Sequence, residues 1–254
     1  MTEPEDSLEA VRCFVTLAAD RAEIGDPDGA VAAIERLIAD IYAKHPDVRV
    51  RRAVSSGFIE IAIALSNAGE PASAVRIDER LATVFPHESD PAVRVDLARG
   101  VHNLALHRAQ AGDLSGAIDA GRLLLTTYGS DSNPDIREAV AQGLRNLAID
   151  QATSGDLAGA IETGQRLVDD FGVDQLPVVR AAVSGAMVNL ADNLAQTGRL
   201  SDATATVERI VSIFGDDTDP SVRQCVERAQ ADAENRRAVP ETDDPHTLSE
   251  FLEG

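Results

Sequence analysis

One stretch of the chain decides the fold, Pro134–Gly172, which has the sequence PDIREAVAQGLRNLAIDQATSGDLAGAIETGQRLVDDFG. Residues at helical spacing form one stripe before Gly155 and another after it. The first stripe holds Ile136, Val140, Leu144, Leu147, Ala148 and Gln151, and the second holds Leu157, Ala160, Ile161, Leu167, Val168 and Phe171. This pattern predicts two helices joined by a short turn.

The predicted helix ends carry the residues that favour helix termini. Asn133 can cap the first helix with Pro134 at its first position, and Asp156 can cap the second. Gly155 supplies the permissive turn between them. Because a hairpin with an apolar stripe on each helix cannot bury both stripes alone, it must stack on neighbouring copies.

Edited copies of this hairpin follow one another from Pro4 to Gly215. Prolines open the successive units at Pro4, Pro46, Pro91, Pro134, Pro177 and Pro220. Turn glycines follow at Gly25, Gly69, Gly112, Gly155 and Gly198, each 21 residues after its proline except in the second unit, where two extra residues intervene. We therefore predict one solenoid over residues 1–239, with repeats at about 4–45, 46–90, 91–133, 134–176 and 177–219, a capping helix at 220–239 and an acidic, disordered tail at 240–254.

Several positions hold the same kind of residue in every copy. Alanines that let the two helices cross closely stand at Ala18, Ala62, Ala105, Ala148 and Ala191, and at Ala30, Ala74, Ala117, Ala160 and Ala203. Leucine or isoleucine precedes the first set at Leu17, Ile61, Leu104, Leu147 and Leu190, which we assign to the core. An aromatic residue ends each second helix, at Tyr42, Phe85, Tyr128, Phe171 and Phe214, and is assigned to packing.

Composition narrows the classes of partner. A net charge of −20 argues against binding to nucleic acid or to an anionic membrane surface. The first residues, MTEPEDSLEA, are acidic and lack the basic segment followed by an apolar segment that a signal peptide has. No apolar run reaches the length of a membrane span, about 18–20 residues. We therefore expect a cytoplasmic protein. Cys13 and Cys225 are expected to be free thiols.

Three of the copies share a longer motif, NLALHRAQAGDLSGA at Asn103–Ala117, NLAIDQATSGDLAGA at Asn146–Ala160 and NLADNLAQTGRLSDA at Asn189–Ala203. This motif resembles the tetratricopeptide repeat, and the period of 43 residues is similar to the longer subclass found in kinesin light chains and actinobacterial repeat proteins. The resemblance implies an all-α, right-handed superhelical solenoid of stacked antiparallel helix hairpins. It also implies a concave groove that is lined by the first helices and receives peptides. The second unit departs from the motif at Glu60 and Asp78.

The asparagines Asn103, Asn146 and Asn189 are the sharpest candidates for binding, because asparagine is a mediocre helix former that stacking does not require. An amide side chain matches the C=O and N–H groups of an extended peptide. Helical spacing adds four neighbours to the predicted peptide-binding groove, Arg99, His102, Gln142 and Arg145. The alternative is that each asparagine bonds a neighbouring helix and fixes the stacking angle.

A second polar series, Arg49, Arg94, Arg137, Arg180 and Arg223, lies three residues after each opening proline. A cation at a helix amino terminus opposes the helix dipole, so each arginine needs a compensating partner. The loops just upstream are acidic, which favours a structural role for the arginines over a ligand-binding one.

The sequence gives little support for catalysis. His102 and His107 are five residues apart on a helix, no H-E-x-x-H or C-x-x-C pattern occurs, and no glycine loop fits a phosphate. We therefore expect no metal, no cofactor and no enzymatic activity. The predicted function is an adaptor that binds a protein or peptide partner. The alternative is a structural module that self-assembles into a homo-oligomer through the edges or ends of the solenoid.

Overall fold

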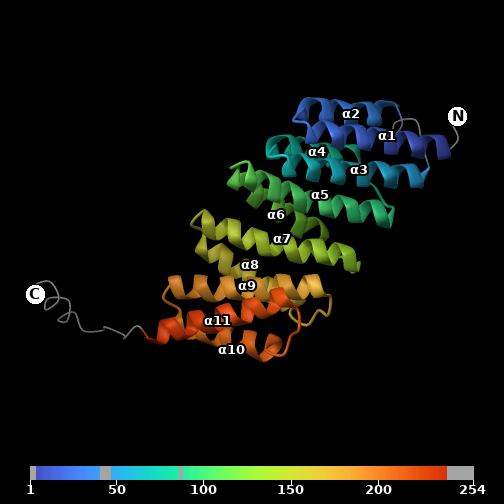
Figure 1. Cartoon of the computed structure of the whole chain (residues 1–254). Helices are drawn as coiled ribbons and strands as arrows, with labels where there is room; N and C mark the ends of the chain where they lie inside the picture. Colours follow the sequence, from blue (N-terminus) through green and yellow to red (C-terminus); the bar gives the residue numbers. More distant parts are fainter. Residues whose placement is uncertain (1–3, 41–46, 86–87, 239–254) are drawn as a thin grey trace, which may run out of the picture. The chain divides into compact units, whose positions relative to one another are not determined.

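A computed structural model of the chain describes residues 4–40, 47–85 and 88–238. This part of the chain is helical, with no strand, which confirms the predicted all-α class (Figure 1). The helices are α1 (Pro4–Glu23), α2 (Pro27–Asp40), α3 (Val48–Asn67), α4 (Pro71–Val84), α5 (Pro91–Gln110), α6 (Leu114–Tyr128), α7 (Pro134–Thr153), α8 (Leu157–Phe171), α9 (Pro177–Gln196), α10 (Leu200–Phe214) and α11 (Pro220–Ala238).

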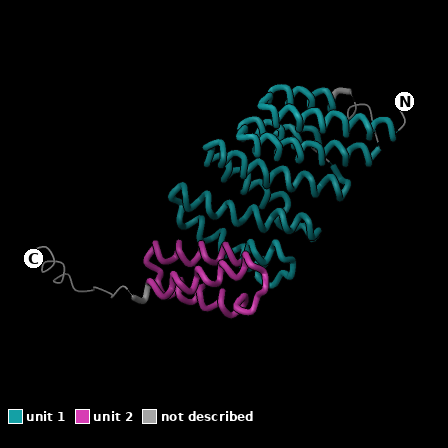
Figure 2. The backbone as a smooth tube through the Cα atoms, in the orientation of Figure 1, with its two compact units in different colours: residues 1–183 teal, residues 184–254 magenta. Residues whose placement is uncertain are grey.

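The chain divides into two compact units, coloured separately in Figure 2. Unit 1, Met1–Val183, holds α1 to α8 and the beginning of α9. Unit 2, Ser184–Gly254, holds the rest of α9 together with α10 and α11. Helices α10 and α11 pack on each other. The predicted tail at 240–254 lies outside the described residues.

The hairpin of α7 and α8 has the predicted ends. The Asn133 side chain accepts a hydrogen bond from the backbone N–H of Asp135, and Asp156 accepts one from Gly159. Gly155 has φ +88°, in the left-handed region where glycine is favoured, and the turn glycines of the other four hairpins share this conformation. Local sequence signals therefore fix both the caps and the turns.

Unit 1 is built in two layers of helices. The first helices α1, α3, α5 and α7 form one layer, in which each helix packs on the next (Figure 1). The second helices α2, α4, α6 and α8 form the other layer, and α4 and α6 each also pack on the first helix that follows. Within the described residues the backbones of α4 and α6 make no close approach to each other, nor do those of α6 and α8. The first layer is therefore the continuous part of the stack.

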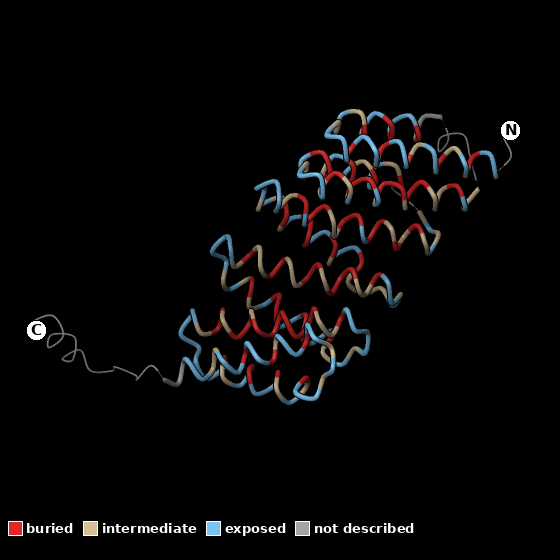
Figure 3. Tube along the Cα trace, in the orientation of Figure 1, coloured by how far each residue is buried: buried red, intermediate tan, exposed pale blue. Residues whose placement is uncertain are grey.

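The repeated alanines and aromatic residues form the core. Both alanine series are buried, as are Phe85, Tyr128, Phe171 and Phe214 (Figure 3). Tyr42 lies outside the described residues. The prediction that Leu17 belongs to the core is wrong, because Leu17 is 45% exposed. The equivalent Leu147 packs against the Cα of Gly121 on the preceding hairpin, whereas no described helix precedes α1.

The sequence predicts that the second repeat begins at about residue 46. Helix α3 begins at Val48, where Asp47 caps it by accepting a hydrogen bond from the N–H of Arg49. Pro46 itself lies outside the described residues. Gly69 stands 21 residues after Val48 (69 − 48), so the second hairpin has the same length as the others from helix start to turn.

Candidate functional site

The first layer of unit 1 has one face that the second layer leaves uncovered. On α3, α5 and α7 the more exposed side chains recur at helical spacing and form one stripe on each helix. We call these three stripes the open face. Its members are Ser56, Glu60, Ile63 and Asn67 on α3, Arg99, Asn103, Leu106 and Gln110 on α5, and Gln142, Asn146, Ile149 and Thr153 on α7.

Two of the predicted asparagines lie on the open face, and one of them bonds a neighbouring helix. The Nδ2 atom of Asn146 lies 3.2 Å from Nε2 of His102 on α5. Because an amide nitrogen only donates, the ring nitrogen accepts and the ring proton is on Nδ1. Burial lowers the pKa of His102 to about 4, so the ring is neutral at neutral pH and this bond is available. Asn146 therefore makes an interhelical hydrogen bond of the kind expected if the asparagines fix the stacking of the helices.

The amide of Asn146 retains groups for a ligand. Its Oδ1 atom and second N–H bond no other residue in the described part of the chain, and the side chain is partly exposed. Asn103 makes no hydrogen bond to a described side chain or backbone group through its amide. These two amides form a short polar row on α5 and α7.

The remaining predicted site residues differ in whether they already have a hydrogen-bond or ion-pair partner. Arg99 pairs with Asp135 at 3.3 Å across α5 and α7, with both side chains about half exposed. Gln142 donates to Oε1 of Glu138 on the same helix at 3.2 Å. Arg145 is partly exposed and has no ion pair within the described ranges. Asn189 is partly exposed on α9 in unit 2.

An apolar row beside the amides was missed at the level of sequence. Ile63 and Leu106 are large hydrophobic side chains that are 43% and 38% exposed, and Ile149 is partly exposed. They stand three residues after Glu60, Asn103 and Asn146, one helical turn along the same face. That constant offset is the signal that could have found them. In unit 2 the same offset gives Asp192, which pairs with Arg228 at 2.9 Å.

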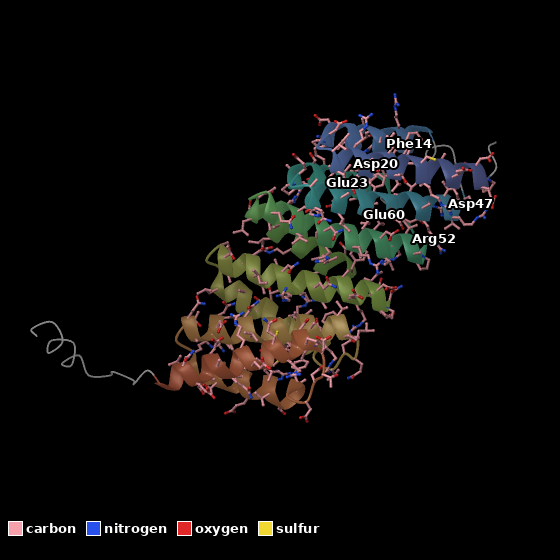
Figure 4. The ribbon with its side chains drawn as sticks, viewed as in Figure 1. Phe14, Asp20, Glu23, Asp47, Arg52 and Glu60 are labelled. Atoms are coloured by element: carbon pink, nitrogen blue, oxygen red, sulfur yellow. The ribbon has the colours of Figure 1, made fainter. Side chains whose placement is uncertain are left out.

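The charge of the open face changes along unit 1. Glu60 in the middle of α3 is an exposed acidic member of the open face (Figure 4). Arg145 precedes Asn146 on α7, at the border of the open face, and has no ion pair within the described ranges, so it adds a positive charge there. The face therefore has a polarity that a bound segment could match in one direction.

Arg94 and Arg137, two members of the arginine series, have structural contacts within their own hairpins. Arg94 pairs with Asp131 at 2.9 Å and lies over the ring of Tyr128. Arg137 repeats this arrangement with Asp174 at 2.9 Å and Phe171. In both hairpins the acidic partner lies in the loop after the hairpin. The predicted pairing of the arginine with the loop before the hairpin is therefore wrong for both. The arginine thus ties the start of the first helix to the end of the second.

The second hairpin shows that this series was misaligned by two residues. Arg51, not Arg49, occupies the position three residues after the start of α3, and it pairs with Glu88 at 2.9 Å. Arg49 pairs with its own cap Asp47 and with Glu5 instead. In unit 2, Arg223 pairs with Glu227 of its own helix at 3.7 Å.

The fold is that of the tetratricopeptide-like repeat solenoids, as the motif predicted. The TPR-like repeats of a Podosopora anserina putative kinesin light chain match with a TM-score of 0.53 at 17% identity, over 84% of this chain and 97% of that one. BtubC (BKLC) from P. vanneervenii matches with a TM-score of 0.60 at 18% identity, over 86% and 85%. No protein-family model and no curated protein matches the sequence.

Two further features bear on classes of function. No helix in the described ranges is long and apolar enough to cross a bilayer. Both cysteines are free thiols, as expected from the sequence.

Proposed function

We propose that this chain is a non-enzymatic adaptor that binds an extended segment of a partner protein along the open face of unit 1. The observation that carries the proposal is the amide row of Asn103 and Asn146 beside the apolar row of Ile63, Leu106 and Ile149. Amides can bond the backbone of an extended segment while an apolar row receives its side chains. Asn103 and the apolar row are at least partly exposed, and Asn146, which also bonds His102, keeps its Oδ1 atom and one N–H for a ligand.

The charges of the open face suggest the chemistry of the segment. Glu60 favours a basic residue at one end of the bound segment, and Arg145 favours an acidic residue or a carboxylate at the other. Arg99 contributes less than the sequence suggested, because Asp135 already pairs with it. The net charge of −20 favours partners that are basic or neutral as a whole. Asn189 on α9 belongs to unit 2 and is not part of the proposed row.

The test is selection of peptides from a random display library on the full chain, followed by calorimetric titration of a selected peptide. Leu106→Asp should weaken binding at least tenfold, and Asn103→Ala about fivefold, as one lost hydrogen bond of about 1 kcal/mol implies. Val173→Asp is the control, because Val173 is exposed in the loop after α8 and is not a member of the open face. Equal affinity for the wild type and the Leu106→Asp variant would contradict the proposal.

A further inference from the structure

A separate hollow lies on the other side of the first layer, between α4 and α6 with α5 as its floor. It encloses a cavity of about 600 Å³, within the range of about 300–1,000 Å³ that small-molecule sites occupy. Its walls are mainly apolar, with Leu81 from α4, Phe85 directly after α4, Leu97 and Leu104 from α5 and Leu123 from α6. The backbones of α4 and α6 make no close approach to each other in the described ranges, and the cavity lies between these helices.

One carboxylate in this wall has an unmet hydrogen-bond acceptor. The Asp78 side chain is 1% exposed, and its Oδ2 lies 2.7 Å from Nδ1 of His107. Its Oδ1 has no hydrogen-bond partner, and no other buried side-chain polar atom in the described ranges is in that state. Leaving such an acceptor unpaired costs about 1–3 kcal/mol.

Stacking does not explain this carboxylate. Asp78 stands four residues after the buried alanine of its helix, and the other hairpins have Ile34, Gly121, Gly164 and Val207 at that position. Apolar or small residues therefore satisfy the repeat there. A carboxylate that the fold does not need, with one free oxygen beside an apolar cavity, fits a ligand that supplies a donor.

The charges around the cavity define that donor. Two other charged side chains line the cavity, and each already has a partner: Glu88 pairs with Arg51, and Arg94 with Asp131. Asp78 is therefore the one charged lining group with a free acceptor among the described residues. A cation is favoured over a neutral donor because a carboxylate bonds a charged donor more strongly and because the whole chain is acidic.

We propose that the cavity between α4 and α6 binds a small organic cation, a primary ammonium group on an apolar body. The ammonium donates to Asp78 Oδ1, and the apolar body lies against Leu97, Leu104 and Leu123. Oδ1 is closed to solvent, so binding includes a rotation of at least one wall side chain. This site is separate from the open face and does not depend on the peptide-binding proposal.

Phenethylamine is a suitable probe, with 2-phenylethanol as the neutral analogue of the same shape. In amide NMR titrations of the full chain at pH 7.5 and 150 mM salt, phenethylamine should shift resonances of α4, α5 and α6. 2-Phenylethanol should bind at least tenfold more weakly. Asp78→Asn should weaken phenethylamine binding at least tenfold, whereas Glu79→Gln, which removes the exposed neighbouring carboxylate, should leave it unchanged.

Leu123→Trp provides a second variant if Asp78→Asn does not fold. Leu123 is 49% exposed, so a larger side chain can be accommodated at the cavity mouth, and it should abolish the shifts by filling the cavity. Equal binding of amine and alcohol, undiminished binding by the Asp78→Asn or Leu123→Trp variant, or shifts spread over the acidic surface would each overturn the proposal.

Discussion

Replacing Asn146 and Asn103 by alanine, one at a time, separates the structural role of the amide row from a binding role. Asn146 donates to His102 at 3.2 Å, whereas Asn103 makes no such bond with a described residue. Alanine is the better helix former by roughly 0.5 kcal/mol, and one hydrogen bond contributes about 1 kcal/mol. We therefore expect Asn146→Ala to lower the free energy of unfolding by about 0.5 kcal/mol and Asn103→Ala to raise it by a similar amount.

The assay is urea unfolding followed by circular dichroism, and the two variants should differ by about 1 kcal/mol. A double-mutant cycle supplies the control. With His102→Phe already in place, Asn146→Ala should lose its penalty, so the coupling energy between the two sites should be about 1 kcal/mol. Equal effects of the two alanine substitutions, together with no coupling to His102, would refute the assignment of the interhelical bond.

Two other predictions follow from burial. Ala160→Leu should destabilise the chain by roughly 1–3 kcal/mol, because Ala160 is fully buried where α7 and α8 cross. Ala158→Leu, on the exposed side of the same helix, should change stability little. Equal melting temperatures of the two variants would contradict this prediction. Since burial lowers the pKa of His102 from 6.5 to about 4, its stabilising contribution is complete above pH 6.5 and is lost as the pH falls to 4, by at most about 3 kcal/mol. The difference in unfolding free energy between wild type and His102→Gln should shrink over that interval, and a pH-independent difference would contradict the assignment.

The sequence predicted the hairpin because its determinants are local. A cap such as Asn133 and a left-handed glycine such as Gly155 act within a few residues, so one repeat contains the whole signal. The alanine series repeats that signal across the chain. The all-helical class and the turns follow from these features without knowledge of any long-range contact.

The arginine series was placed two residues too early in the second hairpin, where two local signals compete. Pro46 is a reasonable helix opener, but Asp47 is a stronger cap, and α3 begins after it at Val48. Counting back 14 residues from Ala62, as from Ala105 to Pro91, would have given Val48 and would have placed Arg51 in the arginine series. The buried alanines therefore align the repeats more reliably than the residues at the helix ends, because a buried position cannot move along the helix without losing its packing.

Contacts between repeats could not be predicted, because their offsets depend on the stacking of one hairpin on the next. Periodicity places Asn146 and His102 on α7 and α5, but not the 3.2 Å between them. The same holds for Arg137, whose partner Asp174 lies in the loop after the hairpin and not in the loop before it. Charge alone allowed either loop.

Departures from the repeat are the most informative positions for function, because the repeat itself accounts for stacking. Asp78 replaces an apolar or small residue, and His107 stands where other first helices have Asp20, Ala64, Asp150 and Asn193. The two departures are 29 residues apart in sequence and meet as one buried pair. Burial raises the pKa of Asp78 to about 6, partly offset by the bond to His107, so the carboxylate destabilises the fold at neutral pH. A destabilising group that stacking does not need, at the wall of a cavity that stacking leaves open, is more economically explained by a ligand than by the fold.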